Sequence, residues 1–269
     1  MLPVADKYAD LVRRLQQLAP VAVAFSGGVD STLLLRVARD VLGADRVLAL
    51  TAVSPLLPRH ELERSQQLAR ILGVRQLLLE TPDLNLPDIF SNQQRRCYFC
   101  KKAILTSFLA KTEELGFANL VDGSNSDDLN DFRPGRAAAN ELGIHSPLTD
   151  AGFNKAEIRQ LSRHLDLPTW DLPSFACLAS RIPYGTAITR ERLAQIEHCE
   201  SHLRQLDFRL YRVRYHGNLA RIELAPEELA RLLEPGLREN IIHVFKTAGF
   251  NYVTLDLQGY RTGSMNETS

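Results

Sequence analysis

A serine and two glycines separate an apolar run from an amphipathic run near residue 26. The apolar run Val21–Phe25 predicts a buried strand, and Asp30 or Ser31 opens a run that predicts a helix. Glycine lets the backbone of such a turn approach a phosphate, and the amides and dipole of a helix start favour an anion. We therefore expect a phosphate-binding loop, and the alternative is a turn that only joins strand to helix. The expected phosphate-binding residues are Ser26, Gly27, Gly28, Asp30 and Ser31.

Two better-known nucleotide loops do not match this one. The Gly-Lys-Ser/Thr ending of a Walker A loop is missing, and so is the G-x-G-x-x-G of a dinucleotide fingerprint. Asp30 can hold the Mg²⁺ that neutralises pyrophosphate, and the alternative role of a helix N-cap is compatible with it. A second acidic loop, residues 122–128, follows the predicted strand Asn119–Val121. Such loops are often solvated turns, but the carboxyl ends of parallel strands place this one beside the phosphate loop.

Three of the four cysteines stand where thiol chemistry is plausible. Cys97 and Cys100 form a C-x-x-C that we place immediately before a helix, where the dipole acidifies thiols. Cys177 lies in an irregular stretch that does not resemble hidden core. Three thiolates can hold a [4Fe–4S] cluster with one open iron, or zinc with a histidine or water completing the site. The structural alternative for the C-x-x-C is a pair of core cysteines, and we expect Cys199 to be ordinary packing.

Two arginines alternate with aromatic and aliphatic residues farther along the chain. Arg212 and Arg214 are two positions apart on a predicted strand and therefore project from one face. Arg221 and Glu223 repeat that arrangement on the next strand. Paired arginines make a good clamp for phosphate or carboxylate. The pattern alone favours the alternative, the solvated polar face of a half-buried hairpin.

The composition limits the partners of these groups. The chain has 269 residues, enough for one large or two modest domains, with 32 basic and 32 acidic side chains. This balance gives no global field toward nucleic acid or a membrane. No apolar run reaches bilayer length, and residues 1–10 lack the apolar core of a signal peptide. We expect a soluble, cytoplasmic protein, in which four cysteines indicate metal or thiol chemistry rather than disulfides.

Alternating strand and helix patterns fill the first half. Predicted strands are Val21–Phe25, Val47–Thr51, Val74–Leu79 and Asn119–Val121, and predicted helices are Ser31–Leu42, Arg59–Leu72 and Lys101–Leu115. This order predicts an α/β domain, residues 1–150, with a parallel sheet and helices on both faces.

The pattern changes after residue 150. We expect helices at Lys155–Leu165, Arg190–Leu206, Pro226–Leu233 and Asn240–Phe250, a hairpin of Phe208–Tyr215 with Leu219–Leu224, and a short strand Tyr252–Leu255. These elements predict a smaller α+β domain, residues 151–269, after a linker near residues 150–155.

Four segments together resemble one family of enzymes. They are A-F-S-G-G-V-D-S-T-L-L from residue 24, C-L-A-S-R-I-P-Y-G from residue 177, Y-R-V-R-Y-H-G with R-I-E-L from residues 211 and 221, and G-Y-R-T-G-S-M-N from residue 259. The first resembles the PP-loop of ATP pyrophosphatases, which cleave ATP between its α- and β-phosphates. All four together resemble the LarE family of ATP-dependent sulfur transferases.

The resemblance implies a step in making the nickel-pincer nucleotide cofactor. ATP would adenylate a carboxylate of pyridinium-3,5-biscarboxylic acid mononucleotide, and sulfur would displace AMP to give a thiocarboxylate. Asp30 would assist adenylation and hold Mg²⁺. Further ATP contacts would come from Thr51, Val53, Gly123 and Asp127, and the substrate and its phosphate would meet Ser180, Arg181, Arg212, Arg214 and Glu223. The family also implies a homo-oligomer, often a hexamer, and a sulfide or other sulfur donor.

The family divides at the source of the sulfur. Some members sacrifice a single cysteine matching Cys177, which becomes dehydroalanine. Others hold a [4Fe–4S] cluster with three cysteines and draw on added sulfide. Because Cys97 and Cys100 accompany Cys177, we favour the cluster and assign all three a catalytic and iron-binding role.

Other PP-loop enzymes remain as alternatives. A tRNA thiolase would activate a base and should carry a basic RNA-binding face, which the balanced charge does not favour. An amidating enzyme, such as an NAD or GMP synthetase, would use ammonia and would not need the cysteines. A nucleotide-binding module without enzymatic activity is the third alternative.

Overall fold

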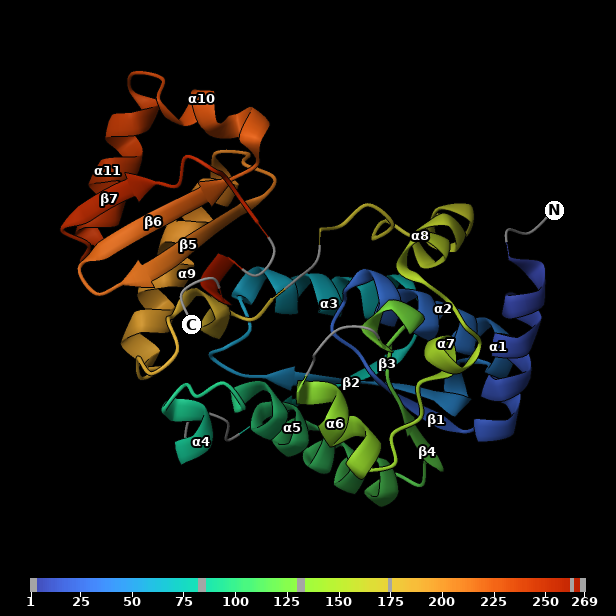
Figure 1. Ribbon diagram of the computed structural model, residues 1–269. Coiled ribbons are helices and arrows are strands. Elements are labelled where there is room, and N and C mark those ends of the chain that lie inside the picture. Colours follow the sequence, from blue (N-terminus) through green and yellow to red (C-terminus); the bar gives the residue numbers. More distant parts are fainter. Residues whose placement is uncertain (1–3, 82–85, 130–133, 174–175, 262–263, 267–269) are drawn as a thin grey trace. The chain divides into compact units, whose positions relative to one another are not determined.

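The computed structural model describes residues 4–81, 86–129, 134–173, 176–261 and 264–266 (Figure 1). It divides into two compact units, the first made of Met1–Leu86 with Arg95–Phe175 and the second of Pro87–Gln94 with Ala176–Ser269. Residues 174–175 and 262–263, which belong to predicted segments, lie outside the described residues.

A parallel sheet forms the centre of the first unit. Among the described residues it has four strands in the order β3-β2-β1-β4. Their bounds are β1 Val21–Ala24, β2 Val47–Val53, β3 Arg75–Glu80 and β4 Asn119–Val121. Val21 of β1 lies opposite Val47 on one side and Asn119 on the other, so the carboxyl ends of these strands lie at one edge. The predicted α/β fold is confirmed.

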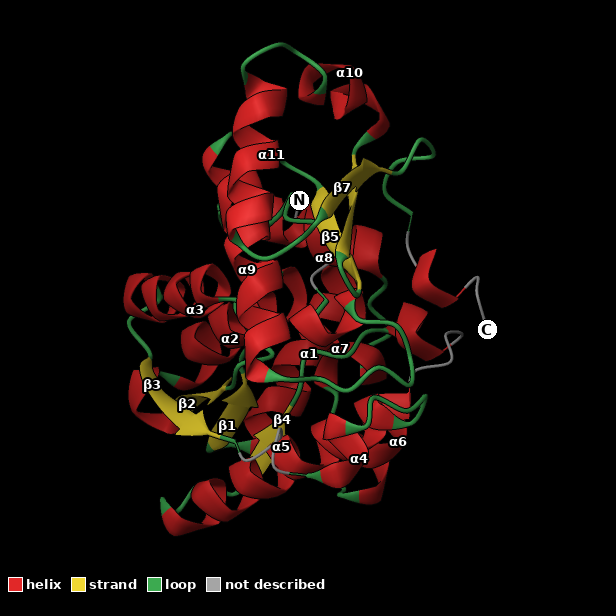
Figure 2. Ribbon diagram, turned by 90° about the vertical axis from the view of Figure 1, so that its left-hand side faces the viewer, coloured by secondary structure: helices red, strands yellow, loops and turns green. Residues whose placement is uncertain are grey.

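Alternating side chains give this sheet two buried faces. Val21 and Val23 belong to one apolar cluster, whereas Ala22 belongs to another. Both faces are buried because helices cover each of them, as Figure 2 shows with α2 and α3 on one side and α5 on the other. The helices and short turns of this unit are α1 Ala5–Leu18, α2 Val29–Leu42, η1 Ala44–Arg46, α3 Arg59–Ile71, α5 Arg96–Glu114, η3 Ser126–Leu129, α6 Pro134–Glu141, α7 Pro147–Asp150 and α8 Lys155–His164.

The division into units falls later than the sequence analysis placed it. Helix α8 packs against α2 and contributes Ile158 and Leu161 to the apolar cluster of the first unit. Residues 151–173 therefore belong with the parallel sheet, whereas the predicted boundary lay after residue 150. The change of pattern at that position marks the end of the sheet but not the end of its helical cover.

The second unit is built on the predicted hairpin. Strands β5 Tyr211–His216 and β6 Leu219–Leu224 are antiparallel, and β7 Tyr252–Leu255 runs parallel to β6. Helices α9 Arg190–Gln205 and α11 Leu237–Thr247 bury Leu203 and Phe245 in one cluster with Val213. The remaining elements are α4 Pro87–Phe90, η4 Leu178–Arg181, η5 Pro226–Glu228, α10 Leu229–Leu232 and η6 Ser264–Asn266. The expected helix Pro226–Leu233 is thus a 3₁₀ turn followed by one α turn.

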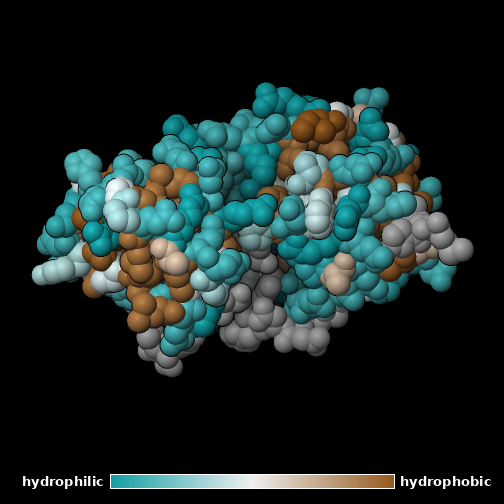
Figure 3. Space-filling view, turned by 90° about the horizontal axis from the view of Figure 1, so that it is seen from above, coloured by the Kyte–Doolittle hydropathy of each residue, from teal (hydrophilic) through white to brown (hydrophobic). Residues whose placement is uncertain are grey.

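One face of the chain is mostly polar. The face in Figure 3 is largely hydrophilic, with apolar residues in separate patches. Across the described residues, no helix is long and apolar enough to cross a bilayer.

Candidate functional site

The predicted phosphate loop, residues 26–31, joins β1 to α2. Helix α2 begins at Val29 with Gly28 as its N-cap, so Asp30 lies inside the first turn and the alternative role of Asp30 as an N-cap is wrong. Among the described residues, no side chain caps this helix. The first amides of a helix have no partner within it, so an uncapped start is suited to an anion.

Two glycines fit where a side chain would not. Gly27 has a φ of 72°, and a Cβ there would lie 3.0 Å from Cα of Ser65 on α3. A Cβ on Gly123, in the loop after β4, would lie 2.9 Å from the backbone nitrogen of Ser31. The two predicted loops are therefore packed backbone to backbone. The prediction that the acidic loop lies beside the phosphate loop is confirmed.

Hydroxyl groups hold the phosphate loop in shape. The Oγ atoms of Ser26 and Ser31 lie 3.1 Å apart, and Ser31 Oγ donates to the carbonyl of Gly28 at 3.3 Å. The amide of Gly28 donates to Ser26 Oγ at 3.3 Å. Ser31 is buried and Ser26 is exposed, so Ser26 is the hydroxyl that a ligand can reach.

Asp30 presents two different carboxylate oxygens. Its Oδ2 accepts a hydrogen bond from Lys155 Nζ at 2.6 Å. Its Oδ1 is buried and has no hydrogen-bond partner among the described residues. An unpartnered buried carboxylate oxygen is costly unless a ligand meets it, and Mg²⁺ prefers oxygen ligands. This oxygen therefore fits the Mg²⁺ site predicted at Asp30. Lys155 was not among the residues predicted from sequence.

The acidic loop has an internal and an outward carboxylate. Asp122 is only 2% exposed and accepts hydrogen bonds from Ser124 and from Ser146 Oγ, with Lys101 Nζ at 3.3 Å. Burial would raise the pKa of Asp122, but Lys101 and these hydrogen bonds outweigh it and lower that pKa. The alternative of a solvated turn is therefore wrong for Asp122. Asp127 is exposed, and its Oδ2 accepts from the backbone nitrogen of Lys155 at 2.9 Å.

The other two predicted ATP contacts lie at the end of β2. Thr51 is buried, and its hydroxyl donates to the carbonyl of Phe25 at 2.6 Å and accepts from Gln76 at 2.8 Å. The carbonyl of Val53 accepts from the amide of Thr81 at 3.1 Å. Thr51 thus fixes the chain that enters the phosphate loop, and direct contact of Thr51 or Val53 with ATP stays a prediction.

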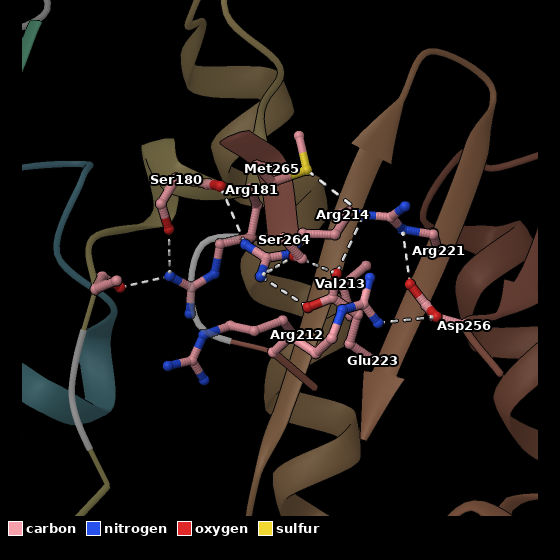
Figure 4. A network of polar contacts seen from close by, with 12 residues as sticks. Ser180, Arg181, Arg212, Val213, Arg214, Arg221, Glu223, Asp256, Ser264 and Met265 are labelled. Carbon is pink, nitrogen blue, oxygen red and sulfur yellow. Dashed lines mark hydrogen bonds and ion pairs between the residues drawn. The ribbon is translucent and has the colours of Figure 1, made fainter. Parts of the chain in front are cut away.

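The predicted arginine pair lies in the second unit. Arg212 and Arg214 are 8% and 5% exposed, and Glu223 is fully buried. The alternation is as predicted, with Arg212 opposite Glu223 and Arg214 opposite Arg221 across the hairpin. The alternative of a solvated face is wrong, because the chain around residues 180 and 264 lies over this face of the sheet (Figure 4).

Glu223 is the centre of the ionic contacts in Figure 4. Its Oε2 accepts from Arg214 Nη2 at 2.7 Å, and its Oε1 accepts from Arg221 at 3.1 Å and from Ser264 Oγ at 2.7 Å. Arg214 also donates to Ser264 Oγ at 3.0 Å and to the carbonyl of Ser180 at 3.1 Å. Arg214 Nε is buried with no partner among the described residues, which leaves a donor for an anion. Ser264 was not singled out from sequence.

A second buried ion pair holds the loop that carries Cys177. Arg181 Nε and Nη2 donate to the two carboxylate oxygens of Glu200 at 2.9 and 3.0 Å. Arg181 Nη1 donates to the carbonyl of Cys177 at 2.9 Å and to Ser180 Oγ at 3.0 Å. All three nitrogens of Arg181 are thus engaged, which favours positioning of the Cys177 loop over direct phosphate binding. Burial would raise the pKa of Glu200, but Arg181 outweighs it and lowers that pKa.

Positive charge is in excess around these pairs. We call Arg181, Arg212 and Arg214, with Glu200 and Glu223, the arginine cluster. Arg212 lies over the ring of Tyr260, 5.1 Å from its centroid. Burial and then the nearby charge of Arg181 lower the pKa of Arg212. A bound anion would relieve this repulsion, so the arginine cluster is suited to phosphate.

The cysteines differ in accessibility. Helix α5 begins at Arg96, so Cys97 and Cys100 lie within its first turns, and the expectation that they precede the helix is wrong. Cys97 is exposed and Cys100 is half-buried, which excludes a pair of core cysteines. Cys177 is half-buried in the second unit. Cys199 is buried, and burial raises the pKa of its thiol to about 12, as expected for packing.

The predicted [4Fe–4S] cluster requires Cys97, Cys100 and Cys177 as its ligands. Within the described residues, the structure contains no group of three or more His, Cys, Asp or Glu side chains arranged to hold a metal ion. Cys97 and Cys100 belong to the first unit and Cys177 to the second. The [4Fe–4S] cluster therefore stays a proposal, for which these cysteines offer three accessible thiols.

Comparisons with known proteins show which proteins this chain is similar to. A family model described as NAD synthase matches residues 7–96. The chain is 38% identical over 268 residues to the pyridinium-3,5-bisthiocarboxylic acid mononucleotide synthase of Lactiplantibacillus plantarum, covering 100% of this chain and 96% of that protein. It is 43% identical over 261 residues to an uncharacterized protein of Synechocystis sp., covering 97% of each. It is 30% identical over 242 residues to an uncharacterized protein of Methanocaldococcus jannaschii, covering 90% of this chain and 91% of that protein.

Proposed function

This chain belongs to the LarE family of PP-loop enzymes, and we propose that it inserts sulfur into pyridinium-3,5-biscarboxylic acid mononucleotide with the use of ATP. The relative from Lactiplantibacillus plantarum is named as the synthase of the corresponding bisthiocarboxylic acid mononucleotide. The observation that carries the proposal is the tether from Arg181 to the carbonyl of Cys177 and the hydroxyl of Ser180, within a buried cluster of arginines. A cysteine beside an anion site is suited to sulfur transfer to a nucleotide, whether its thiolate binds iron or supplies the sulfur.

Adenylation would take place at the phosphate loop. The amides at the start of α2 would hold the phosphates of ATP, and Asp30 Oδ1 would hold Mg²⁺, which when bound neutralises phosphate charge. A substrate carboxylate would attack the α-phosphorus and pyrophosphate would leave. The carboxylate thereby gains AMP as a good leaving group, which sulfur can displace.

The arginine cluster would bind the phosphate of the substrate. Arg214 has a buried Nε without a partner among the described residues. Burial and then the nearby charge of Arg181 lower the pKa of Arg212, and a bound anion would offset both. Glu223 would hold Arg214 in place through its 2.7 Å ion pair. The loop at Ser180 would then bring Cys177 to the bound nucleotide.

We further propose that Cys97, Cys100 and Cys177 hold a [4Fe–4S] cluster, which supplies sulfur to the reaction when bound. The donor set supports this, because these are the accessible thiols among the described residues and Cys199 is buried. Iron and acid-labile sulfide, measured on protein reconstituted without oxygen, test it. We expect about four irons per chain, lost in Cys97→Ser. Iron content that is absent, or that is unchanged in Cys97→Ser, would overturn the cluster.

The test of the overall function is release of pyrophosphate. We expect the chain to release pyrophosphate and AMP from ATP when the pyridinium nucleotide is present, and to form a thiocarboxylate seen by mass spectrometry. Arg214→Met should raise the KM for the pyridinium nucleotide, while the affinity for ATP stays unchanged. Transfer of sulfur to tRNA with no reaction of the pyridinium nucleotide would instead assign the chain to the tRNA thiolases. An amidating enzyme would be indicated if the chain still released pyrophosphate and AMP after Cys97, Cys100 and Cys177 were all changed to serine.

A further inference from the structure

Arg212 differs from Arg214 in the kind of group that it contacts. Across the hairpin, Arg212 lies opposite Glu223. Glu223, however, holds Arg214, whose Nη2 lies 2.7 Å from its Oε2. The guanidinium of Arg212 lies over the ring of Tyr260, with its Cζ 5.1 Å from the ring centroid. A carboxylate therefore fixes Arg214, whereas an aromatic ring lies against Arg212.

Backbone contacts fix Tyr260 at the end of β6. Its amide donates to the carbonyl of Leu224, the last residue of that strand, at 2.7 Å. A Cβ on Gly259, which has a φ of 70°, would lie 2.8 Å from the same carbonyl oxygen, so the chain passes too close to β6 for a larger residue. Among the described residues, the half-buried Tyr260 lies outside the apolar cluster that contains Val213 and Phe245. Packing of that core therefore does not explain where the ring lies.

An aromatic ring stabilises a cation in a way that suits a binding site. The negative face of the ring attracts the flat face of a guanidinium, whereas a carboxylate takes up its N–H donors. Burial and then the charge of Arg181 disfavour the charged form of Arg212. The Tyr260 ring offsets part of this cost and uses none of the N–H groups with which a guanidinium binds phosphate.

We propose that Tyr260 is a positioning residue that holds the Arg212 guanidinium in place for the phosphate of the pyridinium nucleotide. The proposal rests on the proposed binding of this phosphate by the arginine cluster. Tyr260 would act through Arg212 and would touch no reacting atom. Loss of the ring should therefore weaken the binding of the nucleotide and leave the turnover of the bound complex almost unchanged.

A double-mutant cycle separates this role from a structural one. Calorimetry without ATP would measure the affinity of the chain for the pyridinium nucleotide. Tyr260→Leu should weaken this affinity about fivefold to tenfold, with kcat within about twofold, whereas Tyr260→Phe keeps the ring face and should stay within about twofold. In a chain that already carries Arg212→Met, Tyr260→Leu should cost less than about twofold more, because the ring acts through Arg212.

Phe208→Leu is the matched control. Arg231 lies over the ring of Phe208, 4.6 Å from its centroid, so this change removes the same kind of contact in the same unit from a pair outside the arginine cluster. We expect the affinity for the pyridinium nucleotide to stay within about twofold.

Fluorinated rings test the charge of the ring face directly. Phenylalanine with one, two or three ring fluorines at position 260 keeps nearly the same shape but has a less negative face. The affinity for the pyridinium nucleotide should fall stepwise with each added fluorine. A ring that only fills space would give equal affinities.

Several results would overturn the proposal. They are an unchanged affinity in Tyr260→Leu or in Arg212→Met, an equal loss from Tyr260→Leu with and without Arg212→Met, an equal loss in Tyr260→Phe or in Phe208→Leu, and equal affinities across the fluorinated rings. If the unchanged chain does not bind the pyridinium nucleotide, the proposed function itself fails, and the role of Tyr260 falls with it.

Discussion

The phosphate loop and the arginine cluster are suited to anions by opposite means. The phosphate loop uses neutral backbone amides at an uncapped helix start, packed against Gly123. The arginine cluster uses buried ions, with Arg181 on Glu200 and Arg214 on Glu223. Buried ions are stable only while they stay paired, whereas amides at a helix start need no partner of opposite charge. The second unit should therefore be sensitive to removal of a charged side chain, and the first unit to an added Cβ for which there is no room.

Removal of one buried charge should produce the largest effect. Glu200→Ala leaves Arg181 buried without its partner, and we expect the free energy of unfolding to fall by about 3–5 kcal/mol. Denaturant unfolding measures this. Glu234→Ala, on the exposed surface of the same unit, should change that free energy by less than about 0.5 kcal/mol. Equal effects of the two changes would contradict the expected dependence of the second unit on the Arg181–Glu200 ion pair.

An added Cβ at the phosphate loop should have the second largest effect on stability. Gly123→Ala places a Cβ 2.9 Å from the backbone of Ser31, and we expect a loss of about 1–3 kcal/mol in stability together with weaker binding of ATP. Calorimetry with ATP and Mg²⁺ checks the second part. Gly143→Ala is the control. Its φ of 66° makes alanine strained there, but a Cβ at this position has no described atom within 4 Å. If Gly143→Ala weakened ATP binding as much, close packing at Gly123 would not be the reason.

The core of the second unit should also respond to alkaline pH. Burial raises the pKa of the Cys199 thiol from 9.0 to about 12. A raised pKa in the folded state gives stability that is complete below pH 9.0 and is lost as the pH rises toward about 12. The unchanged chain should therefore lose stability relative to Cys199→Ala by about 1.4 kcal/mol per pH unit above this threshold. Parallel unfolding curves of both proteins at pH 8 and about pH 10 measure the difference, and curves that keep a constant separation would contradict it.

A single hydroxyl in the arginine cluster should have the smallest effect. Ser264→Ala removes the hydroxyl that donates to Glu223 and accepts from Arg214. We expect a loss of about 1 kcal/mol in stability and a KM for the pyridinium nucleotide raised severalfold, with kcat little changed. A Ser264→Thr variant keeps the hydroxyl and should restore much of the affinity. An unchanged KM in Ser264→Ala would remove Ser264 from the positioning of Arg214.

Local patterns predicted the fold and the phosphate loop well. The strand Val21–Ala24, the glycines after it and the helix that follows are contiguous, so their spacing alone specifies a strand, a turn and a helix start. The hairpin of β5 and β6 followed from strict alternation for the same reason. The start of α5 was missed because Arg96 and the cysteines do not continue an apolar stripe.

Groups that act through distant contacts were not predicted. Lys155 is 125 positions from Asp30 in the sequence, and the residue types around each of them do not predict the ion pair. Glu200 had a usable signal, because it lies four positions after Ile196 and three before Leu203, on the apolar stripe of α9. A charged residue on such a stripe predicts a buried partner. Arg181 was singled out, but its use as that partner became visible only in the structure.

The most direct test of sulfur insertion is a count of products per chain. Protein reconstituted with iron and sulfide without oxygen would be mixed with ATP, Mg²⁺, sulfide and excess pyridinium nucleotide, and the thiocarboxylate and the intact mass of the chain would be measured together. We expect several thiocarboxylates per chain and an unchanged protein mass. One product per chain, with the mass of hydrogen sulfide lost from Cys177, would contradict the cluster, and absence of any thiocarboxylate would contradict sulfur insertion itself.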